Sequence, residues 1–112
     1  MISGAHLIIY SKNADADKVF FRDVLQLTNV DVGHGWLIFA LPPSELAIHP
    51  SVDSDHHEMY LMCDDIRVFV QQMTEHKIAC TEILDQGWGK LVQLTLPGGG
   101  KIGVYEPRHE RP

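Results

Sequence analysis

Phe20-Phe21-Arg22-Asp23-Val24-Leu25-Gln26-Leu27 is the stretch that decides the fold, because it has helical spacing and follows a strand-like run. Residues 5–10 form that run, an apolar segment typical of a buried strand. Asn13 can cap the helix that begins after this run and continues through residues 20–27. The apolar positions of the helix recur at helical intervals: Ala16, Phe20, Val24 and Leu27. The chain therefore opens with a strand followed by a helix.

The same order of elements occurs twice. Extended segments are predicted after the first helix at residues 28–33, 36–41 and 45–49. A second strand at 59–63 leads into a helix that starts at Asp64-Asp65, with apolar Ile66, Phe69, Val70 and Met73. Further extended segments follow near 79–84, 91–96 and 102–105. The sequence thus predicts two βαβββ units, and a unit this small would struggle to bury a core alone.

Composition and charge exclude several classes of protein. Of the 112 residues, 45% are hydrophobic, which is enough for a packed core. The formal charge is −6 and no basic patch is present, so we expect no nucleic-acid partner. No apolar run approaches about 18 residues and the start lacks signal-peptide features, so we expect no membrane partner and a cytoplasmic location. Cys63 and Cys80 are predicted to be inert, buried thiols.

The order of elements and the ending Leu96-Pro97-Gly98-Gly99-Gly100-Lys101-Ile102-Gly103-Val104-Tyr105-Glu106-Pro107 resemble the vicinal oxygen chelate family. The family includes glyoxalase I, extradiol dioxygenases, fosfomycin-resistance transferases and bleomycin-binding proteins. The resemblance implies an α+β fold in which two βαβββ modules form a cup-shaped, partly open mixed sheet with flanking helices. One glyoxalase/bleomycin-resistance-like domain is expected over residues 1–112, with module one about 1–52 and module two about 56–110. Gln26 departs from the glycine usual in the family, which suggests a different exit from the helix, with a longer last turn.

The resemblance also implies positions for a metal site. Metal-dependent members of the family carry His, Glu, His and Glu on the first and last strands of the two modules. In this sequence the four positions fall, in order, on His6, His49, Glu58 and Gly103. A one-residue slip would put Ile48 in the second place or His57 in the third. The fourth donor is missing, because Gly103 has no side chain.

Strand alternation decides whether a neighbour can replace that donor. Gly103 shares a face with Tyr105, whereas Glu106 faces away unless a bulge shifts the register. The remaining donors are two histidines and one carboxylate, a set that suits non-haem Fe(II) and catalytic Zn or Mn. Two expectations stay open: a divalent metal (Fe, Mn, Zn or Ni) on these donors, or no cofactor, with His6 hydrogen-bonded in the core or touching a ligand.

A cup without a metal would still bind a small molecule, through an apolar lining with a few polar groups. The candidate ligand-binding residues are Tyr10, Trp36, Tyr60, Trp88, Gly103 and Tyr105. Gly103 would leave room for the ligand. Trp88, between two glycines, would be either a lid contact or an anchor on the sheet. Strand aromatics are otherwise most often part of a core.

Two functions therefore compete. The first is a small-molecule-binding protein of the glyoxalase/bleomycin-resistance type that acts as a metal-dependent dioxygenase, lyase or transferase with an incomplete metal set. The second is a metal-free binding protein that sequesters an antibiotic or a metabolite. The missing donor at Gly103 disfavours a glyoxalase-type isomerase and suits a binder, so whether the chain is an enzyme stays open. The resemblance also implies a homodimer, which would be symmetric.

Overall fold

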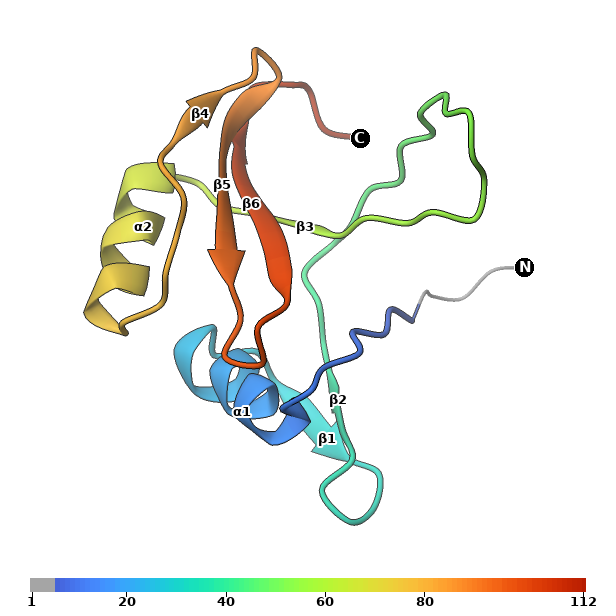
Figure 1. Cartoon of the computed structure of the whole chain (residues 1–112), viewed down its shortest axis with the longest axis vertical. Helices are drawn as coiled ribbons and strands as arrows, with labels where there is room; N and C mark the ends of the chain where they lie inside the picture. Colours follow the sequence, from blue (N-terminus) through green and yellow to red (C-terminus); the bar gives the residue numbers. More distant parts are fainter. Residues whose placement is uncertain (1–5) are drawn as a thin grey trace.

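The computed structural model describes residues 6–112 and shows an α+β chain with two sheets (Figure 1). Residues 1–5, which include the first residue of the strand predicted at 5–10, lie outside the described part. The elements are α1 (Ala14–Val19), the π-helical turn η1 (Phe20–Val24), β1 (Asn29–Asp31), β2 (Leu37–Phe39), β3 (Tyr60–Met62), α2 (Ile66–Glu75), β4 (Leu84–Asp85), β5 (Gly89–Thr95) and β6 (Lys101–Pro107).

The second module forms the main sheet, with strand order β3-β6-β5-β4. β3 runs parallel to β6, and the other neighbours are antiparallel, so the sheet is mixed as predicted. The register places Tyr60 opposite Gly103 and Leu91 opposite Tyr105. Asp65 caps α2 by accepting from the backbone N–H groups of Arg67 and Val68, which fixes where the helix starts.

One face of this sheet packs into the core with both helices. The buried apolar residues are Phe20, Phe21, Ile66, Met73, Val92, Leu94, Leu96, Ile102 and Val104. Val92 and Leu94 alternate along β5 with more exposed residues, and Ile102 and Val104 do the same along β6. This alternation by two leaves Leu91, Gln93, Gly103 and Tyr105 on the opposite face.

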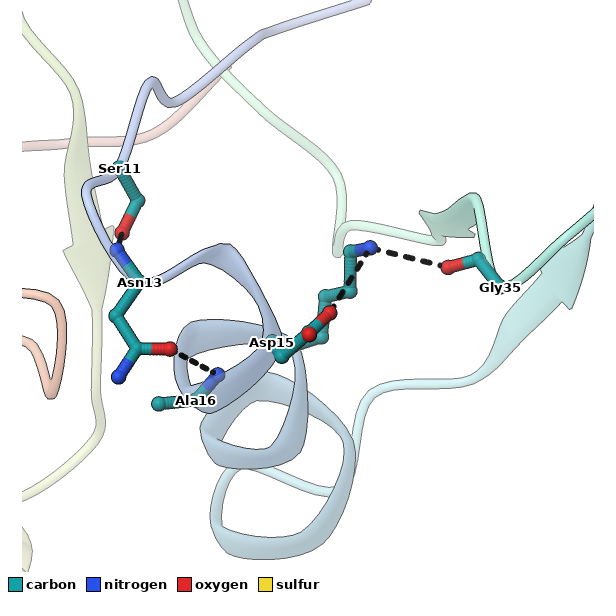
Figure 2. A network of polar contacts seen from close by, with 6 residues as sticks. Ser11, Asn13, Asp15, Ala16 and Gly35 are labelled. Atoms are coloured by element: carbon teal, nitrogen blue, oxygen red, sulfur yellow. Dashed lines mark hydrogen bonds and ion pairs between the residues drawn. The ribbon is translucent and has the colours of Figure 1, made fainter.

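Helix α1 is held at its start and by its neighbours (Figure 2). Asn13 Oδ1 accepts from the Ala16 N–H at 3.2 Å, which is the predicted cap. Lys18 Nζ lies 3.7 Å from Asp15 Oδ1 and donates to the Gly35 carbonyl at 3.1 Å. The second contact ties the helix to the turn between β1 and β2.

A buried carboxylate joins α1 to the turn between β5 and β6. Asp17 is 6% exposed, and its Oδ1 accepts from the Gly98 N–H at 2.7 Å. A side chain at position 98 would overlap Ser11 Oγ and crowd Asp17, so glycine is required for this approach. The helix of module one is thereby fastened to the hairpin of module two.

The helix exit at Gln26 shows the longer last turn that was expected, but not a different exit. The Leu27 N–H bonds to the Phe21 carbonyl at 3.1 Å, and Gln26 itself takes the left-handed conformation with φ of 58°. The chain therefore keeps the exit that a glycine would give, with a wide π-helical last turn before it. Glutamine adopts this conformation at a steric cost that glycine avoids.

Replacing Gln26 with glycine is therefore expected to stabilise the fold by about 1 kcal/mol, since the Cβ strain disappears. Thermal unfolding followed by circular dichroism measures the change. Gln71 is exposed in the middle of α2, so Gln71→Gly serves as a control and should destabilise by about 1 kcal/mol. A lower melting temperature for Gln26→Gly would contradict the strain argument.

Two of the strands predicted in module one are not formed in the single chain. Residues 6–10 and 45–49 belong to no ladder in the described structure, and β1 and β2 pair only with each other. The segment at 6–10 was expected to be buried, yet Ile8 is 62% exposed. Apolar periodicity records a tendency to be extended, whereas a strand exists only where a neighbouring strand satisfies its backbone groups. The segment predicted at 79–84 does lie along β5, through a bridge at Cys80 and backbone hydrogen bonds of Ala79 and Thr81, and only its last residue, Leu84, belongs to β4.

None of the helices in residues 6–112 is long and apolar enough to cross a membrane.

Candidate functional site

The face of the main sheet opposite the core carries Tyr60, Leu91, Gln93, Gly103 and Tyr105, and we call it the open face. A groove of about 410 Å³ lies on it, lined by Glu58, Tyr60, Leu91, Gln93 and Gly103 among others. A second hollow of about 340 Å³ shares Leu91 and Gln93 with the first. The two hollows therefore adjoin across the sheet and offer a surface of mixed polarity.

Three aromatic side chains meet on the open face near the turn between β4 and β5. We call Tyr60, Trp88 and Tyr105 the aromatic trio. The ring centroids of Trp88 and Tyr105 are 5.0 Å apart, those of Tyr60 and Tyr105 are 6.0 Å apart, and those of Tyr60 and Trp88 are 6.4 Å apart. All three pairs are edge-to-face, an arrangement that aromatic quadrupoles favour. Tyr60 and Trp88 each remain 43% exposed, so part of the cluster is accessible to a ligand.

Two glycines allow the rings to lie close to the sheet. A Cβ at Gly103 would overlap the ring of Tyr60. A Cβ at Gly89 would lie 2.7 Å from the Glu106 carbonyl oxygen and 2.9 Å from the Tyr105 ring. Gly103 was expected to leave room for a ligand. The Tyr60 ring occupies that space instead, so the absence of a side chain at Gly103 lets the ring pack against the sheet.

Polar groups around the trio orient the two phenols. The Tyr60 hydroxyl donates to Glu58 Oε2 at 3.0 Å, and this hydrogen bond, with burial, raises the pKa of Tyr60. Burial, followed by the negative charge of Glu45, raises the pKa of Tyr105, whose hydroxyl lies 2.9 Å from His109 Nε2. Both phenols therefore stay protonated at neutral pH and keep a hydroxyl for hydrogen bonding.

The turn that carries Trp88 is held by an ion pair. Arg108 binds both carboxylate oxygens of Asp85, at 2.5 and 2.7 Å, and the Arg108 N–H bonds to the Trp88 carbonyl at 2.9 Å. Asp85 also accepts from the Gly87 N–H at 3.0 Å. The hydrogen bond from Arg108, followed by that from Gly87, lowers the pKa of Asp85.

Acid should therefore loosen this turn. A carboxyl whose pKa is depressed by folding stabilises the protein above its unfolded pKa, about 3.9, and loses that contribution as pH falls through the depressed value. Wild type should melt at a higher temperature than Asp85→Asn at pH 7, with a difference that shrinks below about pH 4. Melting curves from pH 7 to pH 3 measure this. A difference that is constant over the range would contradict a role for the Asp85 charge.

The predicted metal donors are not gathered in one chain. His6 and His49 are exposed, and Glu58 bonds to Tyr60. Across residues 6–112 no group of three or more His, Cys, Asp and Glu side chains is close enough together to hold a metal ion. The slipped alternative, His57, lines the groove beside Glu58. The metal site at His6, His49 and Glu58 therefore stays a prediction.

The predicted ligand-binding residues divide into two groups. Tyr60, Trp88, Gly103 and Tyr105 lie together, and Tyr10 lines the groove although it is 89% exposed. Trp36 is 71% exposed in the turn between β1 and β2, at the opposite end of the molecule from the turn between β4 and β5 (Figure 1). Sequence reasoning missed Leu91, Gln93 and Gly89, although strand alternation on β5 would have placed all three on one face.

Both cysteines are free and half-buried. Burial, followed by the charges of Glu106, Asp64 and Asp65, raises the pKa of Cys63 to about 11, and burial raises the pKa of Cys80. The thiols are therefore protonated at neutral pH, in agreement with the prediction of inert side chains.

Comparison with known proteins shows the fold. No family model and no curated protein matches the sequence. Among solved structures, TnmS3, an antibiotic binding protein from Streptomyces sp. CB03234, superposes with a TM-score of 0.71 at 19% identity, over 95% of this chain and 97% of that chain.

Two further solved structures have a similar fold. Lactoylglutathione lyase from Agrobacterium tumefaciens has a TM-score of 0.67 at 16% identity, over 93% of this chain and 92% of that chain. A member of the glyoxalase/bleomycin resistance protein/dioxygenase superfamily from Sphaerobacter thermophilus DSM 20745 has a TM-score of 0.64 at 20% identity, over 94% of this chain and 98% of that chain.

Proposed function

The chain has the fold shared by glyoxalase and bleomycin-resistance proteins, and we propose that it is a metal-free protein that binds a planar, largely apolar small molecule on its open face. The observation that carries the proposal is that Tyr60 of the aromatic trio lines a groove of about 410 Å³, a size within the usual range of ligand sites, while Trp88 and Tyr105 pack against Tyr60. TnmS3, whose overall fold is similar, is an antibiotic-binding protein, which supports the same role.

The groove combines the two features that small-molecule sites need. Exposed ring area on Tyr60 and Trp88 provides apolar contact for a flat ligand, at little conformational cost. Gln93 and the Tyr60 hydroxyl provide hydrogen-bonding groups that fix the orientation of the ligand. Apolar ring area beside a few hydrogen-bonding groups is the combination that supports binding of a small molecule.

Binding of neutral planar compounds tests the proposal. The chain has two tryptophans, so a Trp36→Phe variant leaves Trp88 as the single fluorescent reporter. Titration with 2-naphthol and 9-phenanthrol should quench this fluorescence in a saturable manner, and a competing ligand that does not itself quench tryptophan should reverse it. Quenching that rises linearly with concentration, as collisions would produce, would overturn the proposal.

The alternative hypothesis, a metal-dependent enzyme, has a direct test of its own. Protein purified without a nickel column should contain far less than one equivalent of Fe, Mn, Zn or Ni, and its melting temperature should not respond to these ions. One bound equivalent that disappears in both His6→Ala and His49→Ala would instead establish the enzyme reading.

We also propose that the protein is a homodimer. Residues 6–10 and 44–50 are strand-length segments without a ladder, and they expose large apolar side chains: Leu7, Ile8, Leu46 and Ile48. Unpaired extended backbone is a template for pairing with another chain, and β3 lies at an open edge of the main sheet. A second copy supplies both partners symmetrically, and because residues 9 and 10 flank the groove, dimerisation would also shape the site.

Light scattering coupled to size exclusion should accordingly give twice the chain mass. Ile8→Lys should shift the protein toward the monomer, because a charge would replace an apolar contact at the interface. Val68→Lys, on the exposed side of α2, is the matched control and should stay dimeric. A wild-type protein that is monomeric at all concentrations would remove the dimer proposal.

A further inference from the structure

A β-bulge lies at the edge of the main sheet, on the segment that leads into β4. Cys80 pairs with Leu94, and Leu84 pairs with Leu91. Three residues lie between Cys80 and Leu84, but only two lie between Leu91 and Leu94, so the outer segment has one extra residue. A bulge of this kind bends the strand and can re-aim a side chain toward a site.

The Thr81 side chain completes the hydrogen bonding at the bulge. In a regular antiparallel ladder the Gln93 N–H would bond to a backbone carbonyl, but here it donates to Thr81 Oγ1 at 2.9 Å. The Thr81 N–H donates to the Gln93 carbonyl at 2.9 Å. Thr81 therefore stays opposite Gln93 on the open face, and the irregularity falls on the residues that follow it.

The side chain that the bulge re-aims is that of Glu82. Neighbouring residues of a regular strand face opposite sides of the sheet, so Glu82 would face away from Thr81. Both residues nevertheless line the second hollow, together with Leu84, Leu91 and Gln93. The bulge thus brings a carboxylate to the open face, and none of the ion pairs among residues 6–112 involves it.

The two hollows lie along one row of residues that crosses the main sheet. The register aligns, in order, Tyr60, Gly103, Gln93 and Thr81. The Tyr60 ring covers Gly103 at one end, and Gln93 lines both hollows. Two strand spacings separate Gly103 from Thr81, a distance of about 10 Å, which is the length of two linked aromatic rings.

The two ends of this row differ in charge. Lys101 lines the first hollow, and the register of β3 on β6 places it alongside Glu58, so acid and base lie together there. Within the described residues, the lining of the second hollow has a single charged side chain, that of Glu82. The far end of the row is therefore the place where an acceptor of full charge faces a ligand.

We infer that Glu82 is a specificity-determining residue, which accepts a hydrogen bond from a hydroxyl group at the end of an elongated aromatic ligand. The inference rests on the proposed function and deepens it: the rings lie along the row from the Tyr60 ring over Gln93, and the hydroxyl reaches the second hollow. A hydrogen bond to a carboxylate is roughly twice as strong as one to a neutral acceptor. Glu82 should therefore favour a phenol over an ether of the same shape.

Two probes that differ by one methyl group test the inference. One is 4-phenylphenol, and the other is its methyl ether, 4-methoxybiphenyl, which has no hydrogen to donate. Isothermal titration calorimetry on the full chain should give an affinity for the phenol about tenfold higher, the size expected for a hydrogen bond to a charged group.

Variants assign the preference to the Glu82 carboxylate. Glu82→Gln keeps an accepting oxygen without the charge, so it should reduce the preference severalfold and leave the affinity for 4-methoxybiphenyl unchanged. Glu75→Gln removes the same charge from the exposed end of α2 and should leave the preference intact. Glu58→Gln, at the first hollow, should leave it intact as well.

The bulge itself can be tested through Thr81, a positioning residue. Thr81→Val removes the oxygen that accepts from the Gln93 N–H and should reduce the preference for the phenol. Thr81→Ser keeps that oxygen and should retain the preference. Thermal unfolding of both variants verifies that they are folded at the temperature of the titration.

The outcomes separate the inference from the proposed function. Equal affinity of wild type for the two probes would overturn the role of Glu82 and leave binding of aromatic molecules in place. If neither biphenyl binds while 2-naphthol does, the ligand does not extend to Glu82 and the inference alone is overturned. If none of the three binds, both are overturned. A preference that is lost in Glu58→Gln but unchanged in Glu82→Gln would place the hydroxyl at the first hollow and contradict the inference.

Discussion

Gly103→Glu is expected to displace the Tyr60 ring, destabilise the protein by about 1–3 kcal/mol and reduce ligand affinity at least tenfold. The physical reason is overlap, because any Cβ at position 103 would enter the space that the Tyr60 ring fills. Urea unfolding measures the free energy of unfolding, and the fluorescence titration in the Trp36→Phe background measures affinity. The same substitution restores the carboxylate that the family resemblance expects at this position.

Two variants control for this interpretation. Gly100→Ala, on the adjoining turn, would meet no atom closer than 3.9 Å and should be almost neutral. Tyr60→Ala combined with Gly103→Glu should be more stable than the sum of the two single changes predicts, since the overlap is gone. Strictly additive changes would show that Gly103 and Tyr60 do not share this space.

Trp88→Leu is expected to reduce the affinity for planar ligands by about thirtyfold, because a well-placed aromatic anchor contributes about 2 kcal/mol to binding. The melting temperature should fall only slightly, since Trp88 is already 43% exposed. Calorimetry with 9-phenanthrol measures the affinity without needing the tryptophan signal. Tyr60→Leu and Tyr105→Leu should have effects of the same sign.

Trp36→Leu is the matched control for that experiment. Trp36 is 71% exposed in the turn between β1 and β2, away from the trio, so its replacement should not change the affinity. An equal loss in Trp36→Leu and Trp88→Leu would mean that the ligand does not bind at the aromatic trio. A strong loss in Trp36→Leu alone would move the site to module one.

Much of the fold could be predicted because its signals are local. Ile66, Phe69, Val70 and Met73 have helical spacing, and α2 spans Ile66–Glu75. Asn13 was predicted as a cap and makes the capping bond. The strands predicted at 6–10 and 45–49 are not formed in the single chain. Strand pairing depends on the backbone of a partner strand, which a local sequence pattern does not identify.

The candidate site was predicted less completely, because it depends on contacts between distant residues. Tyr60, Trp88 and Tyr105 were each named from the sequence, yet only the register of β3 on β6 and the β4–β5 turn bring them together. The overlap between Gly103 and Tyr60 follows from the same register and has no local signal. The metal donors were assigned from the family's strand positions, at which only His6 has the family's residue type, and position in the sequence does not ensure proximity in space.

Amide chemical shifts of the isotopically labelled protein, recorded during titration with 9-phenanthrol, test the central claim most directly. The account predicts saturable shifts at Tyr60, Trp88, Gly103 and Tyr105, with α2 unaffected along its exposed side. Shifts confined to α2 or to the turn between β1 and β2, or no shifts at all, would contradict binding on the open face.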